Sequence, residues 1–294
     1  MNKVGFIGVG IMGKSMVRNL MKAGFELHIY ARTKSKVEDV IDEGAQFHES
    51  IKDCVQDCDA VITIVGFPQD VEEVYFDEGN ILDSAKEGAY LIDMTTTSPQ
   101  IAEKIYAEGT KRGFHVMDAP VTGGDTGAKA GTLSILVGGE KEDYEACMPL
   151  FEAMGTNINY QGKAGCGQHC KLANQIMIAG TLSGVCEALT YAKEQGLDPE
   201  VFMKSVATGA AGSKQLDTFG PKILKDDYAP GFFMKHFIKD MKLALIEANR
   251  KGLSLDVLSM VLANYEELEQ EGYGDLGTQA LMKFYDEEHR NMEE

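Results

Sequence analysis

The sequence predicts an α/β protein in which an N-terminal Rossmann-type, doubly wound sheet is followed by an all-α C-terminal domain. Three observations support this prediction. A glycine-rich turn follows a short apolar segment at the start of the chain, strand-like and helical segments alternate through the first half, and only helical periodicity continues after residue 165. We place the domains at residues 1–163 and 164–294, joined by a helix at about 166–195.

The composition is typical of a soluble globular protein with a strong negative charge. Of 294 residues, 44% are hydrophobic and 25% are charged, and the formal net charge is −18. This charge repels nucleic-acid phosphates, and no polybasic patch is present for a membrane surface, so we expect neither partner. An apolar segment begins directly after Met1-Asn2-Lys3, with no signal peptide or spanning segment, and we expect a cytoplasmic protein.

The six cysteines form no CxxC pair, which favours reduced thiols. Cys54/Cys58 and Cys166/Cys170 have helical spacing, but no histidine or carboxylate completes either pair at ligand spacing. We therefore predict no metal site.

Residues 8–13 read Gly-Val-Gly-Ile-Met-Gly and connect the first apolar segment to a helical pattern, after which a second strand-like segment follows at 26–30. In such a βαβ unit Gly8 permits the tight turn, Gly10 lets a pyrophosphate approach the backbone, and Gly13 packs the helix on the strand. The phosphates then lie at the helix N-terminus. The residues predicted to bind a dinucleotide here are Gly8, Gly10, Ile11, Met12 and Gly13.

The end of the second strand indicates which dinucleotide is bound. An NAD site usually has an acid about 20 residues after the glycines, whereas residues 31–36 read Ala-Arg-Thr-Lys-Ser-Lys. Arg32 and Thr33 suit a 2′-phosphate, so we predict a preference for NADP(H), with NAD(H) possible. The alternative is a solvated basic turn.

Four more strand-like segments follow, at 60–65, 90–94, 114–118 and 133–137. Ligands of doubly wound sheets lie beyond the carboxyl ends of the strands, where Val65 and Thr96 fall. Two interpretations of Thr96 stay open. Its hydroxyl contacts a ligand, or it is purely structural, because Ser98 and Pro99 also predict a capped helix start.

After Asp118, a polar turn contains Thr122, Gly123 and Gly124. Its N–H groups and hydroxyl suit a carboxylate. The alternative is a loop whose glycines are needed only for positive φ.

A long apolar segment begins at residue 165, and Gly167, Lys171 and Asn174 fall on one face of the predicted helix. Because the segment is apolar or small almost all round, we expect a buried helix that joins two domains and carries the reactive lysine. The alternative is a lysine that extends from a buried helix to solvent. Further helices are predicted at 199–208, 214–224, 237–251, 255–270 and 277–287, followed by an acidic solvated tail.

Taken together, four motifs resemble the β-hydroxyacid dehydrogenase family, which includes 3-hydroxyisobutyrate dehydrogenase and semialdehyde reductases. The motifs lie in the family's order and cover essentially the whole chain: residues 8–13, 118–124, 167–174 and 239–240.

The resemblance implies a role for each matching residue. Lys171 matches the catalytic lysine and Asn174 a substrate-orienting amide. Lys239 matches a residue beside the nicotinamide and the substrate, and Asp240 supports this site. The substrate-binding turn has Thr122, where the family usually has serine. The remaining matches are Gly123 and Gly124 on the substrate and Val65 and Thr96 on the cofactor. Ala31 replaces an asparagine of NADP-preferring members, and the segment 274–280 lacks a usual second aspartate.

The predicted reaction is reversible hydride transfer between NADP(H) and a small β-hydroxy acid or its semialdehyde or keto acid, with Lys171 as general acid and base. Family members are commonly dimers or tetramers, so a homodimer or homotetramer is expected. The alternatives are an imine reductase-like enzyme, a decarboxylating sugar-acid dehydrogenase, which is usually much longer, and a dinucleotide-binding protein without catalysis.

Overall fold

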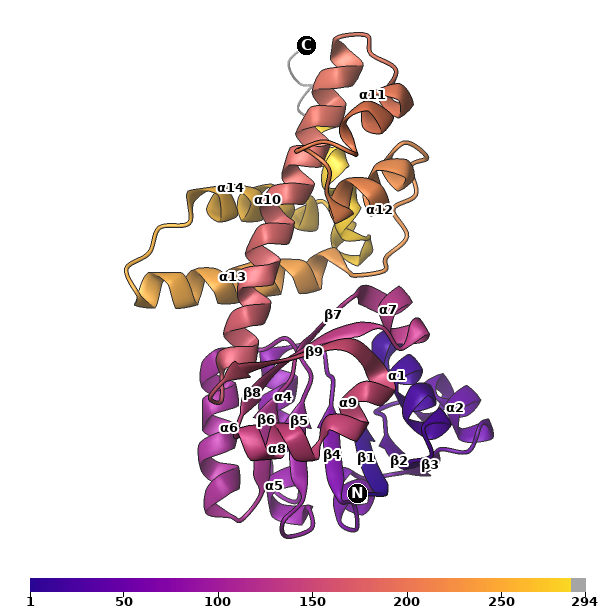
Figure 1. Cartoon of the computed structure of the whole chain (residues 1–294), viewed down its shortest axis with the longest axis vertical. Helices are drawn as coiled ribbons and strands as arrows, with labels where there is room; N and C mark the ends of the chain where they lie inside the picture. The colour runs from indigo at the N-terminus through magenta and orange to yellow at the C-terminus, as the bar shows by residue number, and fades with distance from the viewer. Residues whose placement is uncertain (287–294) are drawn as a thin grey trace. The chain divides into compact units, whose positions relative to one another are not determined.

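The computed structural model describes residues 1–286, and the chain divides into two compact units (Figure 1). The first unit comprises residues 1–171 and the second begins at Leu172. Helix α10 (Cys166–Glu194) therefore contributes its first residues to the first unit and the rest to the second. The boundary after residue 163 stays a prediction.

The first unit is a doubly wound sheet that has nine strands among the described residues. Parallel strands run in the order β3-β2-β1-β4-β5-β6; β8 then joins β6 in the antiparallel sense, with β7 antiparallel and β9 parallel to β8. The strands are β1 (Lys3–Ile7), β2 (Glu26–Tyr30), β3 (Gln46–His48), β4 (Ala60–Thr63), β5 (Tyr90–Asp93), β6 (His115–Asp118), β7 (Val121–Thr122), β8 (Leu133–Gly139) and β9 (Gly155–Gly162). The Rossmann-type prediction is confirmed.

Helices connect these strands and cover both faces of the sheet (Figure 1). They are α1 (Ile11–Lys22), α2 (Glu38–Asp42), α3 (Ile51–Val55), α4 (Pro68–Phe76), α5 (Ile81–Ser84), α6 (Pro99–Lys111), α7 (Gly124–Ala130), α8 (Lys141–Ala146) and α9 (Met148–Met154), with a 3₁₀ turn η1 (Lys34–Lys36). Because neighbouring side chains on a strand face opposite ways, β4 sends Ile62 to the core on one face and Val61 to the core on the other. This alternation buries both faces of the sheet and holds in place the parallel strands whose carboxyl ends lead to the candidate site.

Strands β3, β7 and β9 were not predicted. In β9 the core-facing residue Ile158 stands between the exposed Asn157 and Asn159, so its apolar signal is weak. The other two strands have only three and two residues.

The second unit is helical in its described residues. It contains most of α10, then α11 (Pro199–Val206), α12 (Lys214–Ile223), α13 (Met234–Arg250), α14 (Asp256–Gln270), and the 3₁₀ turns η2 (Tyr273–Asp275) and η3 (Thr278–Leu281). Leu182, Phe237 and Tyr265 are fully buried and belong to its hydrophobic core. The predicted helix at 277–287 is wrong at its start, where a 3₁₀ turn forms, and its last residue and most of the acidic tail lie outside the described residues.

Helix α10 is not buried all round, which corrects the sequence-based expectation. One stripe along it is exposed, formed by Ala173, Met177, Thr181, Gly184, Glu187 and Tyr191. These residues recur every three or four positions, so they share one face, whereas Leu182 and Cys186 face the core. By length and mean hydropathy α10 is also able to cross a membrane, a property that core helices of soluble proteins share.

Candidate active site

In the glycine loop between β1 and α1, close packing requires Gly8 and Gly13, whereas Gly10 faces open space. Gly8 has φ of +98°, and a Cβ there would lie 2.1 Å from the Ile64 carbonyl oxygen. A Cβ on Gly13 would lie 2.1 Å from the carbonyl oxygen of Gly8, so this glycine lets α1 begin against the loop. A Cβ on Gly10 would meet nothing within 4 Å, which leaves the space that a pyrophosphate requires.

The N-terminus of α1 suits an anion. Its N-cap residue, Gly10, has no side chain to bond the N–H groups of the first turn, and that turn contains no acidic residue. Ile11 is half exposed. The positive end of the helix dipole and these N–H groups fit dinucleotide phosphates.

Arg32 follows β2, at the same edge of the sheet, and is held by helix α4. Its Nη2 donates to Asp70 Oδ1 at 2.6 Å and to Glu73 Oε2 at 3.0 Å. The hydrogen bond with Asp70 raises the pKa of Arg32 above its ordinary value. Arg32 is therefore an ion-paired residue and not simply a solvated one, although 62% of its side chain is exposed.

The loops after β4 and β5 are joined by hydrogen bonds. The Val65 N–H donates to Thr95 Oγ1 at 3.0 Å, and Asp93 Oδ1 accepts from the Thr63 hydroxyl at 2.8 Å and from the Thr95 N–H at 3.1 Å. Burial raises the pKa of Asp93 to about 6. Thr96, which follows, is half-buried, and Ser98 caps α6 by accepting from the Gln100 N–H, as the sequence predicts.

The turn at 122–124 connects a strand to a helix. Thr122 pairs with Ser134 of β8, and Gly123 and Gly124 have φ of +131° and +64°. Both glycines thus adopt a backbone conformation that other residues rarely reach. A Cβ on Gly124 would meet nothing within 4 Å, whereas a Cβ on Gly123 would lie 3.3 Å from the Leu133 side chain.

The first turn of α10 is fastened to the sheet by two residues that lie in the sequence motifs but to which the sequence assigns no role. Asp118, at the end of β6, accepts from the N–H groups of Gly165 at 2.7 Å and Gln168 at 2.8 Å. The fully buried Gln168 side chain accepts from the Thr97 N–H at 3.0 Å and donates to the Thr95 carbonyl at 2.7 Å. These bonds fix the turn that precedes Lys171, which is 7% exposed.

Gly167, which shares a helix face with Lys171 and Asn174, lies in close packing and not beside open space. A Cβ on Gly167 would lie 2.3 Å from the Leu136 carbonyl oxygen and 2.8 Å from Asp118. This glycine is required because the helix packs directly on the backbone of the sheet.

In the second unit, Asn174 and Lys239 are linked through buried groups. Asn174 Nδ2 donates to Gln175 Oε1 at 2.7 Å, and Gln175 Nε2 donates to Asp240 Oδ2 at 2.7 Å. Lys239 Nζ lies 3.0 Å from Asp240 Oδ1. Gln175 and Asp240 are almost fully buried, so Asp240 supports Lys239 and also anchors the amide beside Asn174. Gln175 was missed because a glutamine in an apolar helix carries no motif of its own.

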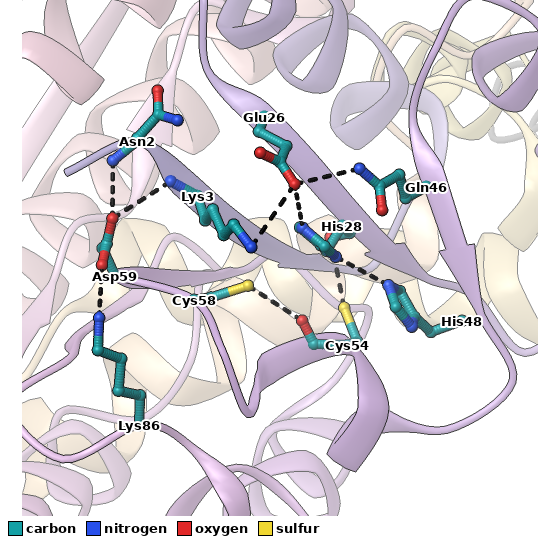
Figure 2. Close-up of polar contacts among 10 residues, drawn as sticks. All are labelled: Asn2, Lys3, Glu26, His28, Gln46, His48, Cys54, Cys58, Asp59 and Lys86. Carbon is teal, nitrogen blue, oxygen red and sulfur yellow. Dashed lines mark hydrogen bonds and ion pairs between the residues drawn. The ribbon is translucent and has the colours of Figure 1, made fainter.

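The thiols of the first cysteine pair point to backbone carbonyl groups. Figure 2 shows the thiol of Cys54 pointing to the backbone carbonyl of His28, at 3.3 Å, and that of Cys58 pointing to the carbonyl of Cys54, at 3.1 Å. Burial raises the pKa of Cys58 to about 12. Within residues 1–286, no three His, Cys, Asp or Glu side chains are grouped so that they could hold a metal ion.

The glycine loop, the open space at Gly10 and the doubly wound sheet define a dinucleotide-binding protein of the Rossmann class. Comparison with known proteins agrees. Residues 3–162 match the family model for the NAD-binding domain of 6-phosphogluconate dehydrogenase, and residues 165–285 match the model described as NAD-binding of NADP-dependent 3-hydroxyisobutyrate dehydrogenase. The chain belongs to the β-hydroxyacid dehydrogenase family and is an NAD(P)-dependent oxidoreductase.

Three curated relatives cover most of the chain. The probable 3-hydroxyisobutyrate dehydrogenase-like 1 of Arabidopsis thaliana is 45% identical over 95% of this chain and 84% of its own. The 2-hydroxy-3-oxopropionate reductase of Escherichia coli is 37% identical over 86% of each chain. The NAD-dependent L-serine dehydrogenase of Pseudomonas aeruginosa is 34% identical over 97% of this chain and 98% of its own.

Solved structures show the same fold. The 3-hydroxyisobutyrate dehydrogenase of Mycobacterium tuberculosis, in a structure with L-serine, is 26% identical with a TM-score of 0.88, and the match covers 96% of this chain and 98% of that one. An imine reductase from Myxococcus stipitatus matches 97% of this chain and 99% of its own with a TM-score of 0.65, but at 16% identity it shows the fold alone.

Proposed function

We propose that this enzyme catalyses reversible hydride transfer between NADP(H) and a small β-hydroxy acid or its semialdehyde or keto acid, with Lys171 as general acid and base. The observation that carries the proposal is the placement of Lys171. This lysine is buried in α10 directly after the turn that Asp118 and Gln168 fasten to the carboxyl edge of the sheet, where dinucleotides bind in such folds. The names of the relatives support the class of reaction.

The bound nicotinamide supplies or accepts the hydride. Lys171 would donate a proton to the substrate oxygen during reduction and accept it during oxidation. An ordinary lysine has a pKa of about 10.4, and a general base at neutral pH works best with a value of about 7 to 8. Burial and the positive charge of an oxidised nicotinamide are effects that lower the pKa of a lysine in that direction.

We assign substrate binding to the turn at 122–124 and to the second unit. The N–H groups of Gly123 and Gly124 and the Thr122 hydroxyl would hold the substrate carboxylate. Asn174 would orient the hydroxyl, since Gln175 fixes its amide. Lys239 and Asp240 are the remaining residues that we predict to bind the substrate. The relatives are named for 3-hydroxyisobutyrate, L-serine and 2-hydroxy-3-oxopropionate, all small acids that carry a hydroxyl group.

For the cofactor we propose NADP(H) as the preferred form, with NAD(H) also accepted. Gly8, Gly10, Ile11, Met12 and Gly13 would hold the pyrophosphate, and Val65 and Thr96 the nicotinamide end. Arg32 and Thr33 would contact a 2′-phosphate, because the end of β2 offers a guanidinium and a hydroxyl in place of an acid.

Replacing Lys171 tests the mechanism. The Lys171→Ala variant should lose turnover by about 10²-fold or more, since a general acid–base residue contributes this much, while NADPH binding changes little. Lys193→Ala, which removes an exposed lysine near the end of the same helix, is the matched control. A near-normal rate in the Lys171 variant contradicts the proposal.

A substrate panel tests the reaction. Glyoxylate, succinic semialdehyde, 2-hydroxy-3-oxopropionate and methylmalonate semialdehyde, each with NADPH and NADH, should include at least one rapid substrate. The same assay with a cyclic imine checks the reductase alternative, and reduction of the imine alone would overturn the proposed substrate class.

We further propose a cytoplasmic homodimer or homotetramer. The exposed stripe on α10 supports an assembly, because Met177 and Tyr191 are 72% and 68% exposed although both are large apolar residues.

A further inference from the structure

Arg32, the proposed 2′-phosphate contact, is bound by two carboxylates of one helix. Asp70 and Glu73 are three residues apart on α4 and therefore share a face. Both accept from Nη2 of Arg32, at 2.6 Å and 3.0 Å. Asp70 is held in turn, because its other oxygen accepts from the Phe67 N–H at 2.9 Å and so caps α4.

This arrangement orients Arg32 without using all of its donors. Neither hydrogen bond involves Nε or Nη1, so the N–H groups on these two nitrogens remain for a ligand. With 62% of the Arg32 side chain exposed, they are accessible from solvent. The guanidinium is thus fixed at the end of β2 while still able to bind an oxygen of the adenosine ribose.

The two acids also change the charge that a cofactor meets. One guanidinium and two carboxylates carry a net charge of −1. Lys34, on the following turn, lies 3.7 Å from Glu49 and is itself ion-paired. A 2′-phosphate brings further negative charge and is repelled by both carboxylates. A 2′-hydroxyl is neutral and can donate to a carboxylate, as it does to the acid that usually ends β2 in NAD sites.

We infer that Asp70 and Glu73 are specificity-determining residues: they orient Arg32, lower the preference for NADP(H) and sustain the binding of NAD(H). They supply, from α4, the acid that the end of β2 lacks. The inference rests on the proposed role of Arg32 and adds a reason for the use of both cofactors.

The experiment compares kcat/KM for NADPH and NADH at low ionic strength with one substrate. Glu73→Gln should raise the NADPH/NADH ratio about 3- to 10-fold, as expected for removing one charge a few ångströms from a partly exposed phosphate site. Glu72→Gln is the matched control, because Glu72 lies on the same helix but pairs with Lys104 at 3.0 Å. Asp70→Asn should change the ratio in the same direction, with its melting temperature measured because Asp70 also caps α4.

The outcomes separate the inference from the function on which it depends. If Arg32→Ala leaves the ratio unchanged, Arg32 does not contact the 2′-phosphate and the proposed NADP(H) site fails. If Arg32→Ala lowers the ratio but Glu73→Gln behaves like Glu72→Gln, only the inference is overturned. A fall in the ratio for Glu73→Gln would also overturn it.

Discussion

Gly10 and Gly13 belong to one motif but have different surroundings, and this difference can be tested. Gly10→Ala should fold with an almost unchanged melting temperature, since φ is −87° and the new Cβ meets nothing within 4 Å. It should weaken NADPH and NADH binding by roughly tenfold or more, equivalent to about 1.4 kcal/mol, because the methyl group occupies the pyrophosphate space.

Gly13→Ala should instead lower the melting temperature, because its Cβ would lie 2.1 Å from the Gly8 carbonyl oxygen. Overpacking of this kind costs about 1–3 kcal/mol. Thermal unfolding and cofactor titration of both variants check the contrast, and tight cofactor binding by Gly10→Ala would refute the placement of the pyrophosphate.

Asp93 makes the stability of the fold depend on pH. Its pKa is raised from 3.8 to about 6, so its protonated form is favoured in the folded state. The stability linked to this proton is fully present below about pH 4 and is lost as the pH rises through about 6. The loss is on the order of 3 kcal/mol, from about two pKa units.

Asp93→Asn should remove this dependence, so that between pH 5 and 7.5 its free energy of unfolding falls less than that of the wild type. Chemical denaturation at several pH values measures the difference. Asp57→Asn, at an exposed position, is the control. Equal pH dependence in the Asp93 variant and the wild type would contradict the assignment.

At the scale of secondary structure elements, the exposed stripe of α10 is expected to lie in a subunit interface. Tyr191→Glu combined with Met177→Glu should shift the protein toward the monomer, since two charges would be buried without partners in an apolar contact. Light scattering after size exclusion measures the mass. Leu253→Glu, at a 57% exposed position outside α10, controls for the added charge. An assembly that persists in the double variant places the interface elsewhere.

The sequence predicts those elements whose signal is local. The glycine motif, the buried parallel strands and the capped start at Ser98 each depend on neighbouring residues, and all appear in the structure. Strand β9 was missed because only Ile158 gives its central residues an apolar signal.

The missed parts of the candidate site depend on distant partners. Gln168 bonds Thr95 and Thr97, more than 70 residues away, and Gln175 bonds Asp240, 65 residues away. Similarly, nothing near Arg32 in the sequence announces its pairing with Asp70. An amide or a carboxylate in the sequence does not specify which group it will meet, because the fold brings the two together.

At the scale of the whole molecule, the net charge of −18 should make stability sensitive to salt. Self-repulsion destabilises the folded state, and salt screens it over about 10 Å at 0.1 M. We therefore expect the melting temperature to rise by several degrees when NaCl is raised from about 20 to about 300 mM at pH 7.5, since this range extends from below to above 0.1 M. Scanning calorimetry checks this, and a fall in the melting temperature would show that screened ion pairs outweigh the repulsion.

The attachment of the first turn of α10 to β6 also affects how the chain folds during synthesis and where chimaeras should be joined. The Asp118 carboxylate accepts from the N–H groups of Gly165 and Gln168, and the Thr97 N–H donates to the Gln168 side chain, so these bonds of the nucleotide-binding unit form only after this turn has left the ribosome. A fragment that stops at residue 163 would keep every strand yet leave the buried Asp118 carboxylate without these donors. Chimaeras with related enzymes should therefore be joined after Lys171, so that one parent supplies this lysine together with the sheet to which its turn is attached.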